Sequence, residues 1–211
     1  MIPTKQEMEK VLVARHGVER FRAFSSAVVA VCGLGGLGSN ISIALARAGI
    51  GKLVLIDFDR VDVSNLHRQQ YKATQVGMLK TEALYENLSE IAPYAEIEIH
   101  SVKMNVENMA DLIKDCSVVC EAFDNAEAKA AIADVVTERF PEKYLVSASG
   151  MAGFGPSNAI KTRKITDKFY LCGDGVSDVN DGIGLVSSRV MLCAAHQAHT
   201  VLRILSREFE V

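Results

Sequence analysis

A glycine-rich turn stands where a phosphate could bind. Gly33, Gly35, Gly36 and Gly38 follow a short valine-rich run and open a segment with helical character. Glycines in that context let the backbone turn tightly and bring amide N–H groups to phosphate oxygens at the positive end of a helix. Asp57 ends the next apolar run, where an acidic residue accepts hydrogen bonds from ribose hydroxyls. The two features predict a nucleotide site, because glycines that only pack a helix against a strand would not account for Asp57.

The segment after Asp57 carries groups that suit a reaction at phosphorus. Its polar side chains, and the lysine that follows them, are Asp59, Asn65, Arg68, Gln69 and Lys80. Cations beside phosphates neutralise the negative charge that accumulates during transfer at phosphorus. A nicotinamide dehydrogenase needs only groups that bind the pyrophosphate of its cofactor and an open path for hydride transfer. The cations therefore favour a reaction at phosphorus over hydride transfer, and a solvated charged loop without chemistry is the alternative.

Alternating strands and helices must position these groups. Strands are expected at 27–32, 52–57, 96–102, 117–122 and 144–148, and helices at 36–48, 74–91, 106–114 and 125–140, with Thr74 and Asn125 as caps of the second and fourth. This alternation predicts an α/β fold with a Rossmann-like, doubly wound and mostly parallel sheet.

The two ends of the chain depart from this alternation. Residues 1–24 form an N-terminal helical segment, and 151–185 hold an antiparallel extension (158–165 with 168–172) and a glycine-rich loop before a final helix at 186–207. No linker or repeat interrupts the sequence, so residues 1–211 are expected to form a single domain.

Composition excludes several classes of protein. The 211 residues are 49% hydrophobic, as in globular proteins, and 23 Lys and Arg against 26 Asp and Glu give a net charge of -3. That balance offers no electrostatic reason to expect nucleic acid or an anionic membrane as partner. No apolar run approaches the roughly 20 residues of a membrane helix. Residues 1–10 are charged and lack the apolar centre of a signal peptide, so a cytoplasmic protein is expected.

The cysteines predict neither zinc nor disulfides. Five cysteines are present, and none are spaced as Cys-x-x-Cys. Cys116 and Cys120 lie on one face of an expected strand, where buried, inert thiols are the simpler interpretation. His196 and His199 could share a face of the final helix, but surface histidines are favoured over metal ligands because no carboxylate or thiolate is in register.

Several separated motifs resemble the ThiF/MoeB/HesA family. The 33–38 turn, the 57–69 segment, Lys80, and the pair Asp124 and Asn125 occur in the family's order, and the similarity runs from about Arg15 to the final helix. Members of this family are bacterial relatives of ubiquitin-activating enzymes. They adenylate the C-terminal carboxylate of a small ubiquitin-like sulfur carrier.

The resemblance implies roles for individual residues. Gly36 and its neighbours would meet the ATP phosphates and Asp57 the ribose, while Asn65, Arg68 and Lys80 would hold the triphosphate. Asp124 would bind Mg²⁺ with Asp59 close by, and Arg15 would cross a homodimer interface into the partner's ATP site. For each residue a surface or capping role is the alternative, as for Asn125 at its helix.

The implied activity is that of an ATP-dependent sulfur carrier adenylyltransferase, which yields an acyl-adenylate and pyrophosphate. A terminal carboxylate with a pKa of about 3.5 is already ionised at neutral pH, so no general base is needed. Three alternatives remain: an NAD(P)- or FAD-dependent oxidoreductase with the same glycine turn, a relative that adenylates a tRNA-attached carboxylate, and an adaptor without activity.

The sequence also departs from better-known members, which carry two zinc-binding Cys-x-x-Cys pairs. Residues 150–153, 169–175 and 193–197 look most like a short, zinc-free ThiF-like branch linked to thiamine synthesis. In some relatives a cysteine after the nucleotide site attacks the adenylate or carries sulfur. Cys172 is the candidate for that thiol, and a passive thiol is the alternative.

Overall fold

A seven-stranded sheet forms the centre of the computed structural model, which describes residues 2–180 and 182–211. The strands are β1 (Val28–Cys32), β2 (Lys52–Ile56), β3 (Glu96–His100), β4 (Val118–Glu121), β5 (Tyr144–Ala148), β6 (Lys161–Lys164) and β7 (Phe169–Gly173). Their order is β3-β2-β1-β4-β5-β7-β6, and only the β6–β7 pair is antiparallel. The predicted fold class, including the antiparallel extension, is confirmed.

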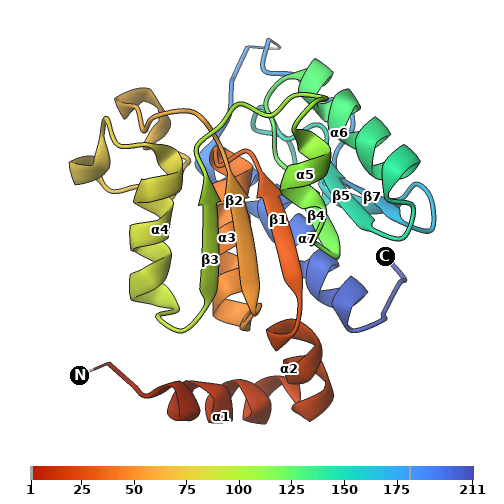
Figure 1. Cartoon of the computed structure of the whole chain (residues 1–211). Coiled ribbons are helices and arrows are strands. Elements are labelled where there is room, and N and C mark those ends of the chain that lie inside the picture. Colours follow the sequence, from red (N-terminus) through yellow and green to blue (C-terminus); the bar gives the residue numbers. More distant parts are fainter. Residues whose placement is uncertain (1, 181) are drawn as a thin grey trace.

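Helices cover both faces of the sheet (Figure 1). They are α1 (Lys5–His16), α2 (Val18–Ser25), α3 (Gly36–Ala48), α4 (Lys80–Ile91), α5 (Met109–Ile113), α6 (Ala126–Arg139) and α7 (Ser187–Leu205). Buried side chains of α3, α4 and α7 form one apolar core with the sheet, and those of α5 and α6 form a second core on the opposite face. The central strands are buried on both sides, which explains their continuous apolar runs.

Most elements lie where the sequence predicts them, and α3 has the predicted bounds. The predicted helix at 74–91 is wrong at its start, because Thr74 lies in a separate 3₁₀ turn (Ala73–Gln75) and α4 begins at Lys80. The N-terminal helical segment is broken at Gly17, whose φ of 82° ends α1 and precedes α2. The helix predicted at 106–114 is shortened to Met109–Ile113, since Asn105 and Asn108 side chains bond the backbone before it.

The carboxyl ends of the parallel strands form the edge of the sheet where a ligand is expected, and we call it the ligand edge. Strand order reverses between β1 and β4, and in open α/β sheets ligands bind outside the carboxyl ends of the strands at that point. The N-terminus of α3 and the loops after β2, β4, β5 and β7 all lie at this edge. In the described part of the chain, no helix has both the length and the apolar character that crossing a bilayer requires.

Candidate active site

The glycine turn between β1 and α3 is built by close backbone contacts. A Cβ atom on Gly38 would lie 1.8 Å from the carbonyl oxygen of Gly33, and one on Gly33 would lie 2.8 Å from that of Ala122. Gly33 also has a φ of +91°, which side chains rarely adopt. No side chain caps the start of α3 at Gly35, so the first amides of the helix face the ligand edge without a side-chain partner. Such a helix start attracts anions.

Asp57 ties this turn to the following loop. Its Oδ2 accepts a hydrogen bond of 2.6 Å from the Leu34 amide, and its Oδ1 accepts one of 2.7 Å from the Asp59 amide. Tyr71 donates its hydroxyl to the Leu34 carbonyl at 2.7 Å from the other side. Asp57 therefore fixes the shape of the turn and of the start of the following loop.

Arg68 and Gln69 lie beside the turn with unsatisfied polar atoms. Arg68 packs against Gly36, since a Cβ there would lie 3.6 Å from its Cγ, and Gln69 lies in the same way against Gly35. The Nε of Arg68 and the Oε1 of Gln69 are buried without a hydrogen-bond partner in the described structure. Burial lowers the pKa of Arg68, and the nearby Asp124 carboxylate opposes that shift. Buried polar atoms are nearly always bonded, so both atoms fit a bound ligand.

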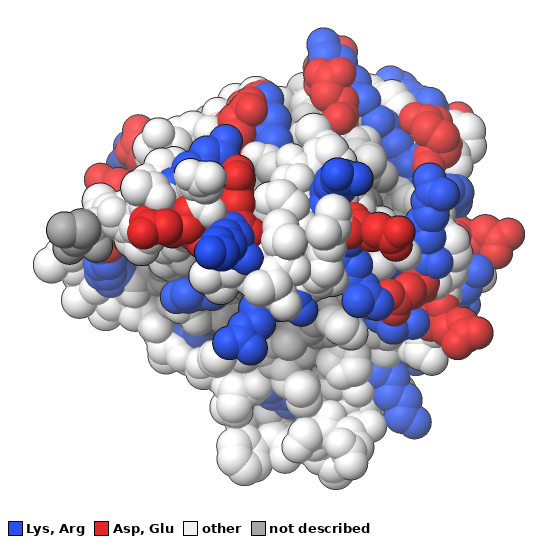
Figure 2. Space-filling model, turned by 90° about the horizontal axis from the view of Figure 1, so that it is seen from below, with Lys and Arg blue, Asp and Glu red and all other residues white. Residues whose placement is uncertain are grey.

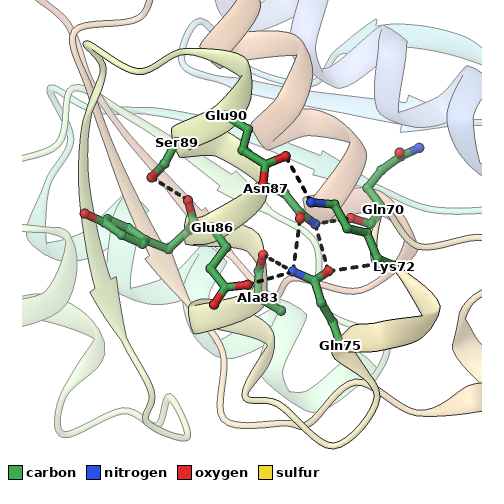
Figure 3. Close-up of polar contacts among 9 residues, drawn as sticks. Gln70, Lys72, Gln75, Ala83, Glu86, Asn87, Ser89 and Glu90 are labelled. Carbon is green, nitrogen blue, oxygen red and sulfur yellow. Dashed lines mark hydrogen bonds and ion pairs between the residues drawn. The ribbon is translucent and has the colours of Figure 1, made fainter.

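Asn65 positions these two residues through its backbone. Its carbonyl oxygen accepts the amides of Arg68 and Gln69, each at 3.1 Å, while its side-chain amide bonds Ser64 at 3.2 Å. The loop itself is fastened to α4 (Figure 3). Asn87 donates to the Gln70 carbonyl at 2.9 Å and exchanges hydrogen bonds with Gln75. Residues 65–70 are thus held on a fixed support.

Lys80 and Asp59 form a close pair at the start of α4. The Lys80 ammonium lies 2.8 Å from Asp59 Oδ2, and the Lys80 amide donates to the Asp59 carbonyl at 2.9 Å. The lysine side chain is 6% exposed. The structure therefore brings a buried cation to the same edge as Arg68.

Asp124 follows β4 and is exposed at the ligand edge, and Asn125 caps α6 by accepting the Ala128 amide at 2.8 Å. Glu121, which holds the segment that carries Asp124 and Asn125, is not identified from the sequence. Glu121 is fully buried, pairs with Lys129 at 2.9 Å and accepts the Phe123 amide at 2.7 Å. A glutamate inside an apolar run, with a lysine eight residues later, was the available signal.

Arg15 is not brought to this site within one chain. It is exposed on α1, at the amino ends of the strands (Figure 1). Leu12 of the same helix lies against Gly49, just beyond the C-terminus of α3. The 13 residues of α3 separate that point from the glycine turn by roughly 18 Å.

Cys172 lies within the core and away from solvent. Its sulfur contacts the hydroxyl of Thr162 at 3.5 Å and that of Thr200 at 4.0 Å. Burial raises its pKa, which disfavours the thiolate. This environment supports the passive alternative over the reactive one.

His196 bonds the Thr162 hydroxyl at 3.0 Å through Nδ1. Across residues 2–180 and 182–211, no three or more His, Cys, Asp or Glu side chains gather as a metal site.

Comparisons with known proteins agree with this geometry. A model of the ThiF family matches residues 8–211. The adenylyltransferase and sulfurtransferase UBA4 of Kluyveromyces lactis is 40% identical over 127 residues, which cover 60% of this chain and 28% of that protein. The adenylyltransferase and sulfurtransferase MOCS3 of Anopheles gambiae is 29% identical over 207 residues, which cover 94% of this chain and 46% of that protein. The chain thus spans less than half the length of these relatives.

Among solved structures, the fold resembles that of E. coli tRNA N6-threonylcarbamoyladenosine dehydratase, TcdA, in complex with ATP. The TM-score is 0.86 at 22% identity, and the match covers 99% of this chain and 98% of that one. The E. coli protein MccB is similar over 94% of this chain, with a TM-score of 0.72 and 19% identity. These two likenesses describe the fold.

Proposed function

Because this chain belongs to the ThiF family, we propose that it is an ATP-dependent adenylyltransferase that activates a carboxylate as an acyl-adenylate. The observation that carries the proposal is the unsatisfied donor of Arg68, its Nε, beside an uncapped helix start. A triphosphate offers oxygens to the guanidinium and to the helix amides. Lys80 adds a second cation at the same edge.

The proposed reaction joins a carboxylate oxygen to the α-phosphorus of ATP and breaks the bond to pyrophosphate. The carboxylate is ionised at neutral pH, so the obstacle is repulsion between two anions. Arg68 and Lys80 would offset this charge, and the helix amides would hold the phosphates in line. Asp124, exposed at the end of β4, suits a Mg²⁺ ion that neutralises phosphate charge when bound; no zinc is invoked.

The proposed substrate is the Gly-Gly carboxylate of a ubiquitin-like sulfur carrier, in thiamine thiazole synthesis. The names of the curated relatives, adenylyltransferase and sulfurtransferase, support a sulfur-carrier chemistry. We further propose a cytoplasmic homodimer in which Arg15 of each subunit enters the other's site. The position of Arg15, exposed on α1 and far from its own glycine turn, supports this proposal.

A second candidate function is adenylation of a carboxylate attached to tRNA. Its support is the likeness in fold to the E. coli tRNA dehydratase over 99% of this chain. The net charge of -3 weakens it. Figure 2 shows the face on the side of α1, opposite the ligand edge, where Lys and Arg side chains are interspersed with Asp and Glu.

Calorimetric titration separates adenylation from the oxidoreductase alternative. Under the proposal, ATP with Mg²⁺ binds the wild-type chain more tightly than NAD⁺ or FAD, and Arg68→Met weakens ATP binding. Tight NAD⁺ binding without ATP binding would overturn adenylation. Pyrophosphate exchange that depends on threonylcarbamoyl-tRNA, and on no carrier, would establish the second candidate instead.

A further inference from the structure

Two loops beside the glycine turn are fastened to each other. The first, residues 149–156, follows β5, and the second, of which the structure describes residues 174–180 and 182–186, follows β7; we call them the acceptor loops. The Asp174 amide donates to the Gly150 carbonyl at 2.8 Å, and the Gly153 amide donates to the Gly184 carbonyl at 2.9 Å. A Cβ on Gly150 would lie 2.1 Å from Asp174 Oδ1, so only glycine fits there. The loops therefore behave as one unit.

A buried ion pair connects these loops to α7. Arg189 bonds Asp174 Oδ2 through Nη2, and both side chains are 7% exposed. The same guanidinium donates to the carbonyls of Ala152 at 3.0 Å, Gly155 at 2.8 Å and Pro156 at 3.1 Å. Asp174 Oδ1 accepts the amides that follow it, at positions 176 and 177, both at 2.9 Å. One guanidinium and one carboxylate thus hold both acceptor loops.

This pair is adjacent to the phosphate-binding residues. Val190, the residue after Arg189, contacts the turn so closely that a Cβ on Gly36 would lie 2.9 Å from its Cγ1. His67, which precedes Arg68, lies 3.2 Å from the Leu185 carbonyl through Nε2. The second acceptor loop therefore borders the residues that would hold the triphosphate.

The topology gives the acceptor loops a distinct place. Asp57, the expected ribose ligand, follows β2, on one side of the point where strand order reverses. The acceptor loops follow β5 and β7, on the other side of that point. A nucleotide held between the glycine turn and Asp57 leaves the β5–β7 side free for the group that attacks the α-phosphorus.

We propose that Asp174 and Arg189 are positioning residues for the acyl half of the adenylate, which they serve by fixing the shape of the acceptor loops. The proposal rests on the adenylyltransferase function proposed above. A role in stability alone is a weaker explanation, because buried ion pairs are often no more stabilising than apolar side chains of similar volume. The carbonyls at 152, 155 and 156 need the planar fork of an arginine, which an ammonium group does not reproduce.

The test compares two ligands by calorimetry. The first is AMP, and the second is a glycylglycyl adenylate analogue in which a sulfamate replaces the phosphate ester. Arg189→Met should weaken binding of the analogue by about tenfold or more and change binding of AMP by less than about twofold. The affinity of Arg189→Lys for the analogue should lie between those of the wild type and Arg189→Met, since lysine retains the positive charge but lacks the planar guanidinium.

Lys143→Met is the matched control for the loss of a buried cation. Lys143 lies just before β5, at the opposite edge of the sheet, and donates to the carbonyls of Lys114 at 2.6 Å and Cys116 at 2.7 Å. Its residue is 7% exposed, like Arg189. This variant should bind both ligands as the wild type does.

Each result decides between the two proposals. If the wild-type chain binds neither ligand, the adenylyltransferase function fails and the positioning role fails with it. The positioning role alone is overturned if the wild type binds AMP and the analogue, and the Arg189 variants lose affinity for the two ligands equally. It is also overturned if Lys143→Met weakens binding of the analogue relative to AMP as Arg189→Met does. Should Arg189→Met fail to fold, Arg189→Lys and the isosteric Asp174→Asn provide the same comparison.

Discussion

Lys80 and Asp59 are bound to each other at the ligand edge, with 2.8 Å between Nζ and Oδ2. The pair is asymmetric, because the lysine side chain is 6% exposed and the aspartate side chain is 46% exposed. The ammonium is therefore held in place by the fold while the carboxylate reaches solvent. A phosphate that approaches Lys80 must compete with Asp59 or share the cation with it.

The first prediction separates these two charges. Measured by calorimetry without Mg²⁺, Lys80→Met should weaken ATP binding by about tenfold or more, since a hydrogen bond to a charged group contributes ~1.5–3 kcal/mol. Asp59→Asn should strengthen ATP binding under the same conditions, because a competing negative charge is removed. Unchanged affinity in Lys80→Met, with a circular dichroism spectrum like that of the wild type, would limit Lys80 to a structural role.

The second prediction concerns the glycine turn. Gly38→Ala should destabilise the chain by about 3 kcal/mol or more, because its Cβ would meet the Gly33 carbonyl at 1.8 Å and backbone cannot move aside cheaply. Gly184→Ala is the control: nothing lies within 4 Å of its Cβ position, so stability should change by less than ~0.5 kcal/mol. Urea denaturation measures both. Equal stability of the two variants would contradict the close packing of α3 on the sheet.

These positions show how far the sequence predicts the structure. Gly33, Gly35, Gly36 and Gly38 are informative because each constrains backbone close to itself in the chain, and α3 accordingly has its predicted bounds. The start of α4 is predicted wrongly, since Thr74 favours a cap locally while Gln75 and Asn87 fasten that segment as a separate turn.

In the candidate site too, some residues are expected from the sequence and others are not. From the sequence, Arg68, Gln69 and Lys80 are expected near the glycine turn because they follow Asp57 in the chain and share its edge of the sheet; their role in a nucleotide site stays a prediction. The pairs Glu121 with Lys129 and Asp174 with Arg189 are not, because each joins separate elements whose proximity depends on the completed fold. Asp174 and Arg189 carry no local pattern that points to each other.

The third prediction is a dependence of stability on pH that Asp174 controls. Burial alone would raise the pKa of Asp174, but the amides of Ser177 and Val176 and the Arg189 guanidinium outweigh it and lower the pKa to about 2. A carboxyl whose pKa is lowered on folding stabilises the fold above its unfolded pKa of about 3.9, and this stability is lost as pH falls toward 2.

The difference in free energy of unfolding between wild type and Asp174→Asn isolates this effect from the other carboxylates. It should be constant above about pH 5 and fall by about 2 kcal/mol between pH 4 and pH 2, as urea titrations at each pH would measure. A difference that stays constant down to pH 2 would show that the pKa of Asp174 is not lowered.

The fourth prediction tests the homodimer with a shared site. Arg15→Ala and Asp124→Ala should each lose pyrophosphate exchange, since one lacks the arginine given to the partner and the other a ligand for Mg²⁺. Mixing them under conditions that exchange subunits should restore part of the activity, because one hybrid site then has both groups. Arg20→Ala, which removes a nearby exposed arginine paired with Glu208, should retain activity when assayed alone. No recovery after verified subunit exchange would refute the role of Arg15 in trans.

Carboxylate-dependent exchange of pyrophosphate into ATP tests the central claim most directly. Candidate ubiquitin-like carriers that end in Gly-Gly are added one at a time with ATP, Mg²⁺ and labelled pyrophosphate. Each is paired with the same carrier whose terminal carboxylate is replaced by a carboxamide. The account predicts exchange with at least one native carrier, none with its carboxamide form, and none with Asp124→Ala. Adenylation of a Gly-Gly carboxylate is contradicted if label enters ATP equally with the carboxamide form, or only when a tRNA substrate replaces the carrier.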